Sequence, residues 1–575
     1  MSDPAAVLSA RVQQAVQSAF GSDFAGIDAL IRPSQFADFQ ANVALSLAKR
    51  LGRPPREVAD AIVAAMDVDD LCSPVGISGP GFVNLTLRDE WIGDRANDQL
   101  ADERLGVPRQ DPQRIPIDYS APNVAKEMHV GHLRTTVVGD ALARTLEHLG
   151  HLVIRQNHIG DWGTPFGMLI EHLLEVGESS NEAGLLRSDP NAFYQAARAK
   201  FDGREEFAGR ARGRVVALQA GDADTLRLWD GLITMSTGYF NRIYRQLGVT
   251  LTDDDLMGES RYNDSLPALC DELEAAGLAV VSEGALCVFL DGFTGREGKP
   301  VPLIIRKSDG GYGYGTTDLA TIRYRVEQLH ADRIIYVIGA PQHLHLQMVF
   351  ATARLAGWLP PEIEPVHVQI GNVLGTDGKI LKSRSGVPIR LGALLGEAVE
   401  RAAAVVDAAR PELDSDLRAA VARDVGIGAV KYADLSVGHD TEYTFDFDRM
   451  LALTGNTAPY LQYASARIFS ILRRAGADTG IGAIVLGEPA ERRLALELLG
   501  YGAAVVEVGD LLEPHRLCTY LFSLAQSFTS FYDSCPVLRA EDPAVRSSRL
   551  ALCALTSRVL VQGLQLLGVN APAQM

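Results

Sequence analysis

The chain has 575 residues, of which 47% are hydrophobic and 22% charged, and these are fractions of a globular protein rather than a disordered one. Its 54 Lys and Arg against 72 Asp and Glu give a net charge of −18, which argues against a protein that coats nucleic acid indiscriminately. The six cysteines form no CxxC pair, no run of about 18 apolar residues occurs, and the first residues lack a signal-peptide pattern. We therefore expect a cytoplasmic protein without a disulfide framework, a cysteine zinc site or a membrane span.

Residues 1–108 are expected to form a small α+β unit. Helical periodicity predicts helices over residues 39–51 and 56–66. The next stretch, SPVGISGPGFVNLTL (73–87), is typical of two strands joined by a Gly-Pro-Gly turn. A group of prolines from residue 108 onward marks the exit from this unit.

Residues 109–395 have the pattern of a Rossmann-like α/β domain with a doubly wound parallel sheet. A strand (114–120), a helix and a second strand come first, and two apolar strands follow at 333–339 and 366–375. The mixed, largely helical stretch of residues 165–300 is interpreted as an insertion into that sheet.

From about residue 396 onward the sequence shows almost only helical periodicity. This pattern predicts a C-terminal all-α helical bundle. We divide it into a helical linker, residues 396–454, and a helical domain, residues 455–575.

The stretch Ser120 to Arg134, SAPNVAKEMHVGHLR, lies between a predicted strand and the start of a predicted helix. Ligands bind at the carboxyl ends of parallel strands, and a helix N-terminus attracts phosphate. His129 and His132 project to the same side of the helix, and Gly131 lets a base or ribose approach the backbone. Neutral imidazoles, helped by the mobile cation of Lys126, can stabilise charge at a transferring nucleotide. Two surface histidines, or a zinc site, are the alternatives.

Two further segments are candidates for ligand binding. The glycine-containing loop 375–390 carries four cations and no acid after Asp377, so it can close over pyrophosphate, with a solvated surface loop as the alternative. Tyr314 and Asp318 lie four residues apart where a Gly-rich turn enters a helix. A carboxylate and a phenol suit a planar cation such as guanidinium. A helix-terminal carboxylate beside a packed tyrosine is the alternative for this pair.

With these residues, the sequence resembles the class I aminoacyl-tRNA synthetases, and closely their arginyl branch. PNVAKEMHVGH (122–132) is similar to the HIGH signature with its arginyl-type prefix, and LKSRSG (381–386) to the arginyl form of the KMSKS loop. Other segments that look arginyl are residues 157–167, 257–263, 307–320, 429–436 and 455–468. The resemblance runs nearly end to end.

The resemblance implies that ATP and L-arginine form arginyl-adenylate and pyrophosphate, and that arginine then passes to the terminal ribose of tRNA(Arg). Activation is expected to depend on tRNA, Mg²⁺ to accompany ATP without a protein-bound metal site, and the enzyme to be a monomer that binds no DNA. The implied catalytic residues are His129, His132, Lys126 and Lys382, which bind ATP together with Gly131 and Ser383. The implied arginine-binding residues are Asn123 and Gln342 for the α-amino group, and Tyr314, Asp318 and, nearby, Glu259 for the guanidinium.

For the tRNA, the resemblance assigns the N-terminal unit to the elbow, the linker to a stem contact and the C-terminal domain to the anticodon. Tyr460, Tyr463 and Arg467 share a predicted helix face, and with Met575 they are the expected tRNA contacts. Residues 449–477 contain four arginines and no acid, and this local basicity suits an RNA ligand in an acidic chain. Packing of the aromatic rings in a core is the alternative.

Two departures from the family pattern bear on these assignments. Ser385 stands where the general loop signature has a lysine, and Lys126, upstream of the HIGH-like segment, is expected to compensate. Gly339 and Pro341 stand in a segment where many relatives carry Asp and Arg before the glutamine.

Two other functions fit part of the sequence. A nucleotidyltransferase that acts on a small acid without tRNA explains His129 and His132 but not the helical domain with its aromatic and basic face. A catalytically silent RNA-binding paralogue explains that domain, but it leaves the intact histidines, Lys126 and Lys382 without a reason.

Overall fold

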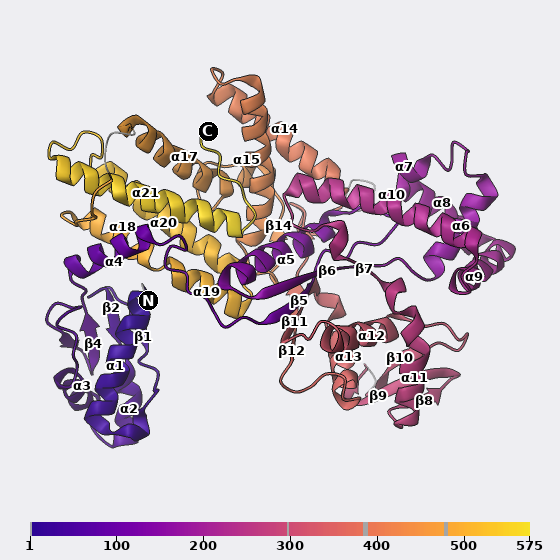
Figure 1. The fold of residues 1–575 in the computed structure, drawn as a ribbon, viewed down its shortest axis with the longest axis horizontal. Helices are drawn as coiled ribbons and strands as arrows, with labels where there is room; N and C mark the ends of the chain where they lie inside the picture. Colours follow the sequence, from indigo (N-terminus) through magenta and orange to yellow (C-terminus); the bar gives the residue numbers. More distant parts are fainter. Residues whose placement is uncertain (1–2, 296–297, 383–388, 477–480) are drawn as a thin grey trace.

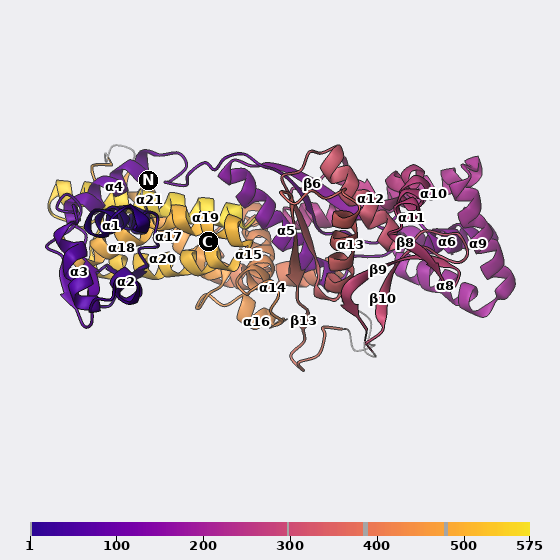
Figure 2. The same ribbon diagram turned by 90° about the horizontal axis from the view of Figure 1, so that it is seen from below.

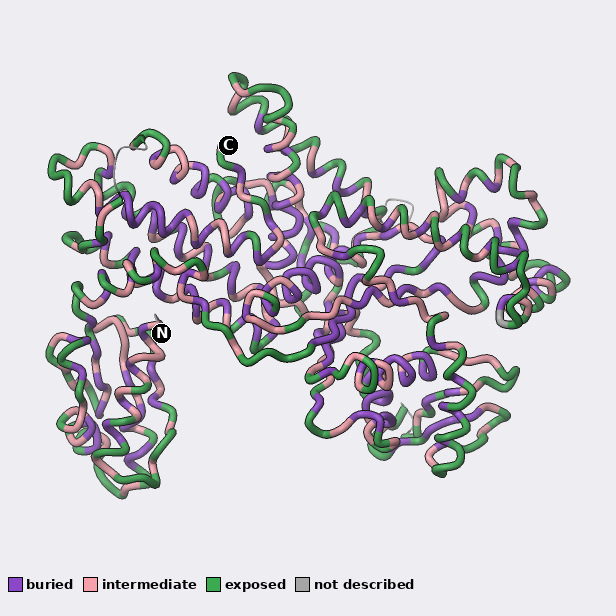
Figure 3. Tube along the Cα trace, viewed as in Figure 1, coloured by how far each residue is buried: buried purple, intermediate pink, exposed green. Residues whose placement is uncertain are grey.

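The structure is a computed structural model and describes residues 3–295, 298–382, 389–476 and 481–575. The molecule is elongated: the N-terminal unit and the C-terminal helices lie at one end, the parallel sheet near the middle and inserted helices at the other end (Figures 1 and 2). Buried residues follow the central strands and the inner sides of the helices around them (Figure 3). None of the described helices is long and apolar enough to cross a membrane.

The N-terminal unit contains an antiparallel sheet in the order β1-β2-β4-β3. Its elements are α1 (Pro4–Phe20), β1 (Ile31–Pro33), β2 (Phe39–Ala41), α2 (Val43–Leu51), α3 (Pro55–Ala64), β3 (Gly76–Ser78), β4 (Phe82–Leu85) and α4 (Asp89–Ala101). The two strands predicted about the Gly-Pro-Gly turn are confirmed as β3 and β4. The helix predicted from residue 39 begins only at Val43, so its start was wrong. The backbone of Phe39–Ala41 pairs with strands on both sides, and this pairing overrides the helical spacing of its apolar residues.

A parallel sheet in the order β12-β11-β5-β6-β7 forms the centre of the described structure. Its strands are β5 (Arg114–Asp118), β6 (Leu152–Ile159), β7 (Leu256–Gly258), β11 (Arg333–Gly339) and β12 (Glu364–Ile370). The principal helices packed on it are α5 (Val130–Leu149), α12 (Tyr314–Glu327) and α13 (His343–Leu355). Ile335 and Val337 of β11 share a core with α5, whereas Ile334 and Tyr336 share another with α12 and α13. Helices thus cover both faces, as the predicted doubly wound fold requires.

The chain between β6 and β11 adds two separate parts to this sheet. The first is helical and consists of α6 (Thr164–Val176), α7 (Leu185–Ser188), α8 (Pro190–Gly203), α9 (Glu205–Gln219) and α10 (Ala223–Leu247). The second contains α11 (Leu266–Ala275) and an antiparallel sheet of β8 (Ala279–Ser282), β9 (Ala285–Thr294) and β10 (Pro300–Arg306). Between them the chain returns to the main sheet as β7, which pairs with β6. One insertion was predicted over residues 165–300, and this prediction missed β7, which divides the insertion in two. A strand of 3 residues is too short to show an alternating pattern of apolar residues in the sequence.

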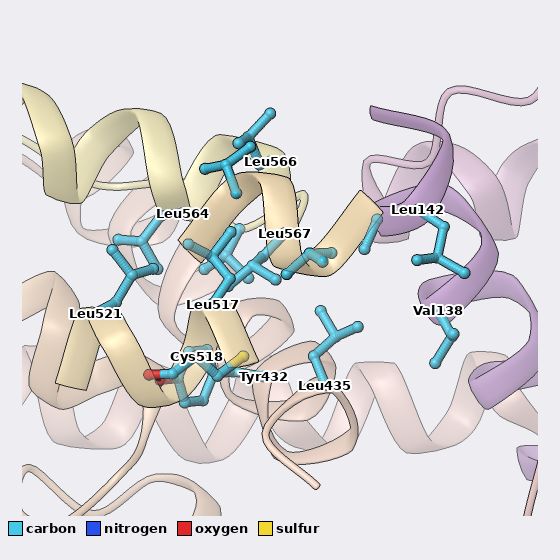
Figure 4. Close-up of a cluster of buried hydrophobic side chains, with 14 of the residues drawn as sticks. Val138, Leu142, Tyr432, Leu435, Leu517, Cys518, Leu521, Leu564, Leu566 and Leu567 are labelled. Atoms are coloured by element: carbon cyan, nitrogen blue, oxygen red, sulfur yellow. Dashed lines mark hydrogen bonds between the residues drawn. The ribbon is translucent and has the colours of Figure 1, made fainter. Parts of the chain in front are cut away.

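The C-terminal part of the described chain is almost wholly helical, as predicted. Its elements, from the end of the sheet domain, are β13 (Val373–Leu374), α14 (Leu391–Ala409), α15 (Ser415–Leu435), β14 (Tyr443–Thr444), α16 (Phe447–Met450), α17 (Ala458–Ala475), α18 (Pro489–Leu499), α19 (Tyr501–Leu511), α20 (His515–Ser534) and α21 (Pro543–Leu566). Figure 4 shows Val138 and Leu142 of α5 facing apolar side chains of α15, α20 and α21. One continuous core therefore joins the sheet domain to the helical bundle.

Candidate active site and RNA-binding cavity

A cavity of about 400 Å³ opens at the carboxyl ends of β5 and β11. In this sheet β5 is the first strand in chain order and its neighbour β11 is the fourth. The chain adds β6 and β7 on one side of β5, and β11 and β12 on the other side, so the direction of strand order reverses between β5 and β11. Open α/β sheets bind their ligands at such a point. The loop after β5, the start of α5 and the segments after β11 and β12 line the cavity.

The loop between β5 and α5 has a strained backbone. Ser120, Ala121 and Ala125 have φ angles of 72°, 44° and 57°, in the left-handed region that residues with a side chain rarely adopt. Helix α10 holds this loop: Tyr244 Oη lies 2.7 Å from Ser120 Oγ, and the Ala125 N–H donates to Ser236 Oγ over 2.9 Å. Strain that the surroundings maintain in this way is typical of functional loops.

His129 and His132 cap the N-terminus of α5. The His129 N–H donates to Nδ1 of His132, and the Gly131 N–H donates to Nδ1 of His129, each over 3.1 Å. Burial and the nearby Lys126 lower the pKa of His129. Burial and the neighbouring His129 lower the pKa of His132 to about 3, so both rings are neutral at pH 7. Because Nδ1 accepts, each neutral ring carries its proton on Nε2, where it can donate to a phosphate oxygen.

Gly131 and Lys126 have surroundings that the sequence did not indicate. A Cβ at residue 131 would lie 2.8 Å from Cε1 of His129, so glycine makes room for the imidazole ring itself. Lys126 lines a neighbouring cavity of about 310 Å³, which shares Asn123 and both histidines with the first. Its ammonium lies 4.1 Å from the centroid of the Tyr194 ring, a cation–π contact contributed by the helical insertion.

The predicted basic loop contributes Lys382 to the 400 Å³ cavity. Ser383, which was also predicted to bind ATP, lies outside the described residues. Arg390 at the far end of the loop is paired with Glu127 and with Asp189, each over 2.9 Å, so it is not a free cation for pyrophosphate.

The residues predicted to bind arginine fall into two groups. Asn123 and Gln342 line the same cavity as the histidines. Tyr314 stands at the start of α12 with most of its side chain exposed. Partial desolvation, together with the charges of Glu259 and Asp318, raises the pKa of its hydroxyl. Burial raises the pKa of Glu259 to about 7, and the nearby Asp318 adds to the rise. A bound cation would relieve this repulsion between carboxylates.

Three further residues, one bonded to Asp318 and two buried in the sheet domain, had no predicted role. His345 Nε2 lies 2.6 Å from Asp318 Oδ2, and this hydrogen bond raises the pKa of His345. Deeper in the sheet, Arg325 donates to Asp118 over 2.8 Å, and both side chains are buried. His345 could have been noticed as a neighbour of Gln342 in the sequence. Arg325 and Asp118 are 207 residues apart, and no local pattern links them.

A second cavity, of about 810 Å³, lies between α17, the end of α20 and the last residues of the chain. Tyr463, Arg467 and Met575 line it, and the Arg467 guanidinium lies 4.9 Å from the centroid of the Tyr463 ring. Other arginines that line this cavity are Arg410, Arg473, Arg474 and Arg539. Tyr460 lies elsewhere: its ring meets that of Phe522 edge-on at 5.5 Å and packs against the core, which fits the alternative of core packing for this residue.

Comparison with known proteins gives a consistent result along the whole chain. The family model for "tRNA synthetases class I (R), catalytic domain" matches residues 96–447, that for "DALR anticodon binding domain" residues 461–575, and that for "Arginyl tRNA synthetase N terminal domain" residues 6–87. The chain is 73% identical to the arginine–tRNA ligase of Thermobifida fusca over 100% of both chains, and 49% identical to that of Edwardsiella ictaluri over 99% of both. The crystal structure of arginyl-tRNA synthetase from Plasmodium falciparum matches with a TM-score of 0.84 and 26% identity over 99% of both chains.

Proposed function

The chain belongs to the family of class I arginyl-tRNA synthetases, and we propose how its residues divide the work of that reaction. The enzyme attaches arginine to tRNA and uses ATP to activate the amino acid. One observation carries the proposal: histidines held neutral line a cavity at the carboxyl ends of β5 and β11, and Glu259 directly follows β7 at the same edge of this parallel sheet.

In the first step, the carboxylate of arginine attacks the α-phosphate of ATP and pyrophosphate leaves. His129 and His132 donate from Nε2 to phosphate oxygens, which stabilises the developing charge without transfer of a proton. Lys382 and its neighbour Ser383 act on the pyrophosphate side. Lys126 adds positive potential from the adjoining cavity and takes the place of the lysine that Ser385 replaces in the loop. Mg²⁺ enters with ATP, and no group of three or more His, Cys, Asp or Glu within the described ranges is placed to hold a metal ion of its own.

The amino acid lies between the two parts of the site. Asn123 and Gln342 hold its α-amino group beside the histidines. Asp318, fixed by His345, and Glu259 bind the guanidinium, and Tyr314 packs against it from the open side. A carboxylate can accept two parallel hydrogen bonds from guanidinium, which lysine cannot supply, so this pocket selects arginine over the other long cation.

In the second step, a hydroxyl of the terminal ribose of tRNA(Arg) attacks the carbonyl of arginyl-adenylate, an ester bond forms and AMP leaves. We assign the cavity lined by Tyr463, Arg467 and Met575 to the anticodon, because stacked rings and arginines bind unpaired bases and phosphates. The N-terminal unit then meets the tRNA elbow and residues 396–454 its stem. The enzyme works as a cytoplasmic monomer, binds no DNA, and activates arginine only when tRNA is bound.

Replacement of Asp318 by asparagine tests the arginine pocket. Asp318→Asn keeps the acceptor for His345 but loses the charge, and a hydrogen bond to a charged group is worth about 1.5–3 kcal/mol. We expect the KM for arginine in the aminoacylation of tRNA(Arg) to rise roughly 10- to 150-fold, with the KM for ATP almost unchanged.

Glu327→Gln is the matched control for this experiment. Glu327 is on the same helix and accepts a hydrogen bond from Arg323 over 3.0 Å at the surface, so both KM values should stay as in the wild type. If Asp318→Asn changed the KM for ATP as much as that for arginine, the assignment of the pocket would be wrong.

A further inference from the structure

Arg134 is a buried charged residue at the active site for which the reaction as described has no use. It follows His132 by two residues on α5 and contributes to the lining of the 400 Å³ cavity. Only 1% of its surface is exposed. Burying a guanidinium costs free energy unless its donors are paired, so the groups that it bonds indicate its structural role.

The guanidinium joins α5 to two other parts of the chain. Its Nε donates to Oδ1 of Asp434 on α15 over 2.7 Å. Its Nη1 and Nη2 donate to the backbone carbonyls of Thr441 and Gly438, over 2.8 and 3.2 Å. The ring of Tyr443 lies beneath it, with its centroid 5.2 Å from Cζ. Arg134 therefore fixes the loop 437–444 against the helix that carries the histidines.

That loop in turn supports the segment that leads to Lys382. The Gly371 N–H donates to the His439 carbonyl over 2.9 Å, and β14 of the loop pairs in parallel with β13. The chain then turns back, and the Leu381 N–H donates to the carbonyl of Val373 in β13 over 2.9 Å. A short series of backbone contacts thus connects the guanidinium of Arg134 to the residue before Lys382.

We propose that Arg134, together with Asp434, is a positioning residue that keeps His129 and His132 in register with Lys382 across the ATP phosphates. The inference rests on the phosphate roles proposed above for these three residues. A buried ion pair adds little net stability compared with apolar packing, but its fork of donors fixes one geometry. A lysine at residue 134 would keep the charge and lose the planar set of donors that reaches Asp434 and two carbonyls at once.

Arg134→Lys and Asp434→Asn test this role, and Arg144→Lys is the matched control. Arg144 is on the same helix and likewise donates to a buried aspartate, Asp140, over 2.7 Å, but among the described residues its hydrogen bonds go to Asp140 and to the Gly248 carbonyl rather than to the loop 437–444. We would measure ATP–pyrophosphate exchange with saturating tRNA(Arg), together with thermal unfolding by circular dichroism. A shift of the phosphate-binding groups by about 1 Å can cost about 100-fold in rate. We expect Arg134→Lys to lower kcat by about that factor and to raise the KM for ATP, while the KM for arginine stays within about twofold of wild type.

Asp434→Asn should also lower kcat and raise the KM for ATP without changing the KM for arginine, but with a smaller loss of kcat. If Arg134→Lys does not fold, Asp434→Asn alone tests the positioning role. Arg144→Lys should lower the unfolding temperature but leave the kinetic constants unchanged. Equal loss of activity in Arg134→Lys and Arg144→Lys, or an equal rise of both KM values, would overturn the positioning role. His132→Gln is measured in parallel: if it were fully active, the underlying phosphate assignment would fail instead.

Discussion

At the residue scale, the proposed roles of His129 and His132 are those of directional donors rather than of charges. Burial holds the pKa of each ring below its ordinary value, so neither is protonated at physiological pH. Attraction for the phosphates must then come from Lys126, Lys382 and the N-terminus of α5, while the rings aim their Nε2–H groups. With the positive charge on the lysines and the directional hydrogen bonds on neutral rings, such a site would bind a highly charged nucleotide and still release pyrophosphate.

Glu259 predicts a pH dependence of arginine binding. Its pKa of about 7 means that it is largely protonated, and neutral, below that pH, whereas the guanidinium of arginine stays charged. Attraction is therefore present above pH 7 and is lost as the pH falls. We expect the KM for arginine to rise by up to about tenfold for each pH unit below 7, measured in aminoacylation assays between about pH 6 and 8.5.

Glu259→Gln isolates the contribution of this carboxyl group. The variant should have a high KM for arginine at every pH and should lose the dependence seen in the wild type. The KM for ATP serves as an internal reference, since the phosphate site is separate. A profile in Glu259→Gln as steep as that of the wild type would show that another group titrates.

Single residues differ in how far the sequence revealed them. The histidines, Lys382 and Asp318 stand in short sequence motifs, so their chemistry could be inferred from the sequence. In the structure the histidines and Lys382 line one cavity, and Asp318 is bonded to His345, which follows β11 of the same sheet. Tyr460 has the same helical spacing as Tyr463, but only packing decides which ring faces the cavity. Arg134 and Asp434 are 300 residues apart, so their contact depends on the tertiary fold alone.

At the scale of the element, the start of α5 depends on one glycine. Its helix cap is made by two histidine side chains, and the ring of His129 occupies the space that a side chain at residue 131 would need. The residues that form the helix cap are therefore those of the proposed phosphate site, so a change that disturbs the cap should also disturb phosphate binding.

Gly131→Ala separates activity from stability. Alanine favours the helix by up to about 1 kcal/mol, but loss of the cap when the His129 ring moves costs about as much. We expect the free energy of unfolding, from urea denaturation, to change by less than about 1 kcal/mol. The kcat for ATP–pyrophosphate exchange should fall by about 100-fold, because Nε2 of His129 is displaced.

Gly231→Ala in α10 is the control for this substitution. A Cβ there would meet no atom within 4 Å, so the variant should gain stability and keep full activity. Wild-type exchange by a folded Gly131→Ala enzyme would contradict the role of the cap geometry.

Most elements could be predicted because their pattern of apolar residues extends over many positions. The strand–helix–strand unit from residue 114 and the C-terminal helices are of this kind. The short strands β7 and β14 could not be predicted, since each is defined by its pairing with a distant strand rather than by its own residues. These are also the strands that complete the sheet and support the segment before Lys382.

At the scale of the whole molecule, the two cavities lie in different domains that share one core. Val138 and Leu142 of α5 pack with leucines of the helical bundle, and Arg134 bonds to α15 of the same bundle (Figure 4). A tRNA that fills the cavity of Tyr463 and Arg467 and reaches the sheet would hold these domains in one arrangement. The proposed dependence of arginine activation on tRNA would act through this physical connection.

ATP–pyrophosphate exchange, measured over the set of amino acids with and without tRNA(Arg), tests this account most directly. Exchange with arginine alone among the amino acids, and only in the presence of tRNA, is the predicted result. Lysine is the decisive competitor, because it carries the charge of arginine without the planar fork. Exchange with another amino acid would contradict the carboxylate pocket, and equal exchange with arginine in the absence of tRNA would contradict the coupling between the two domains.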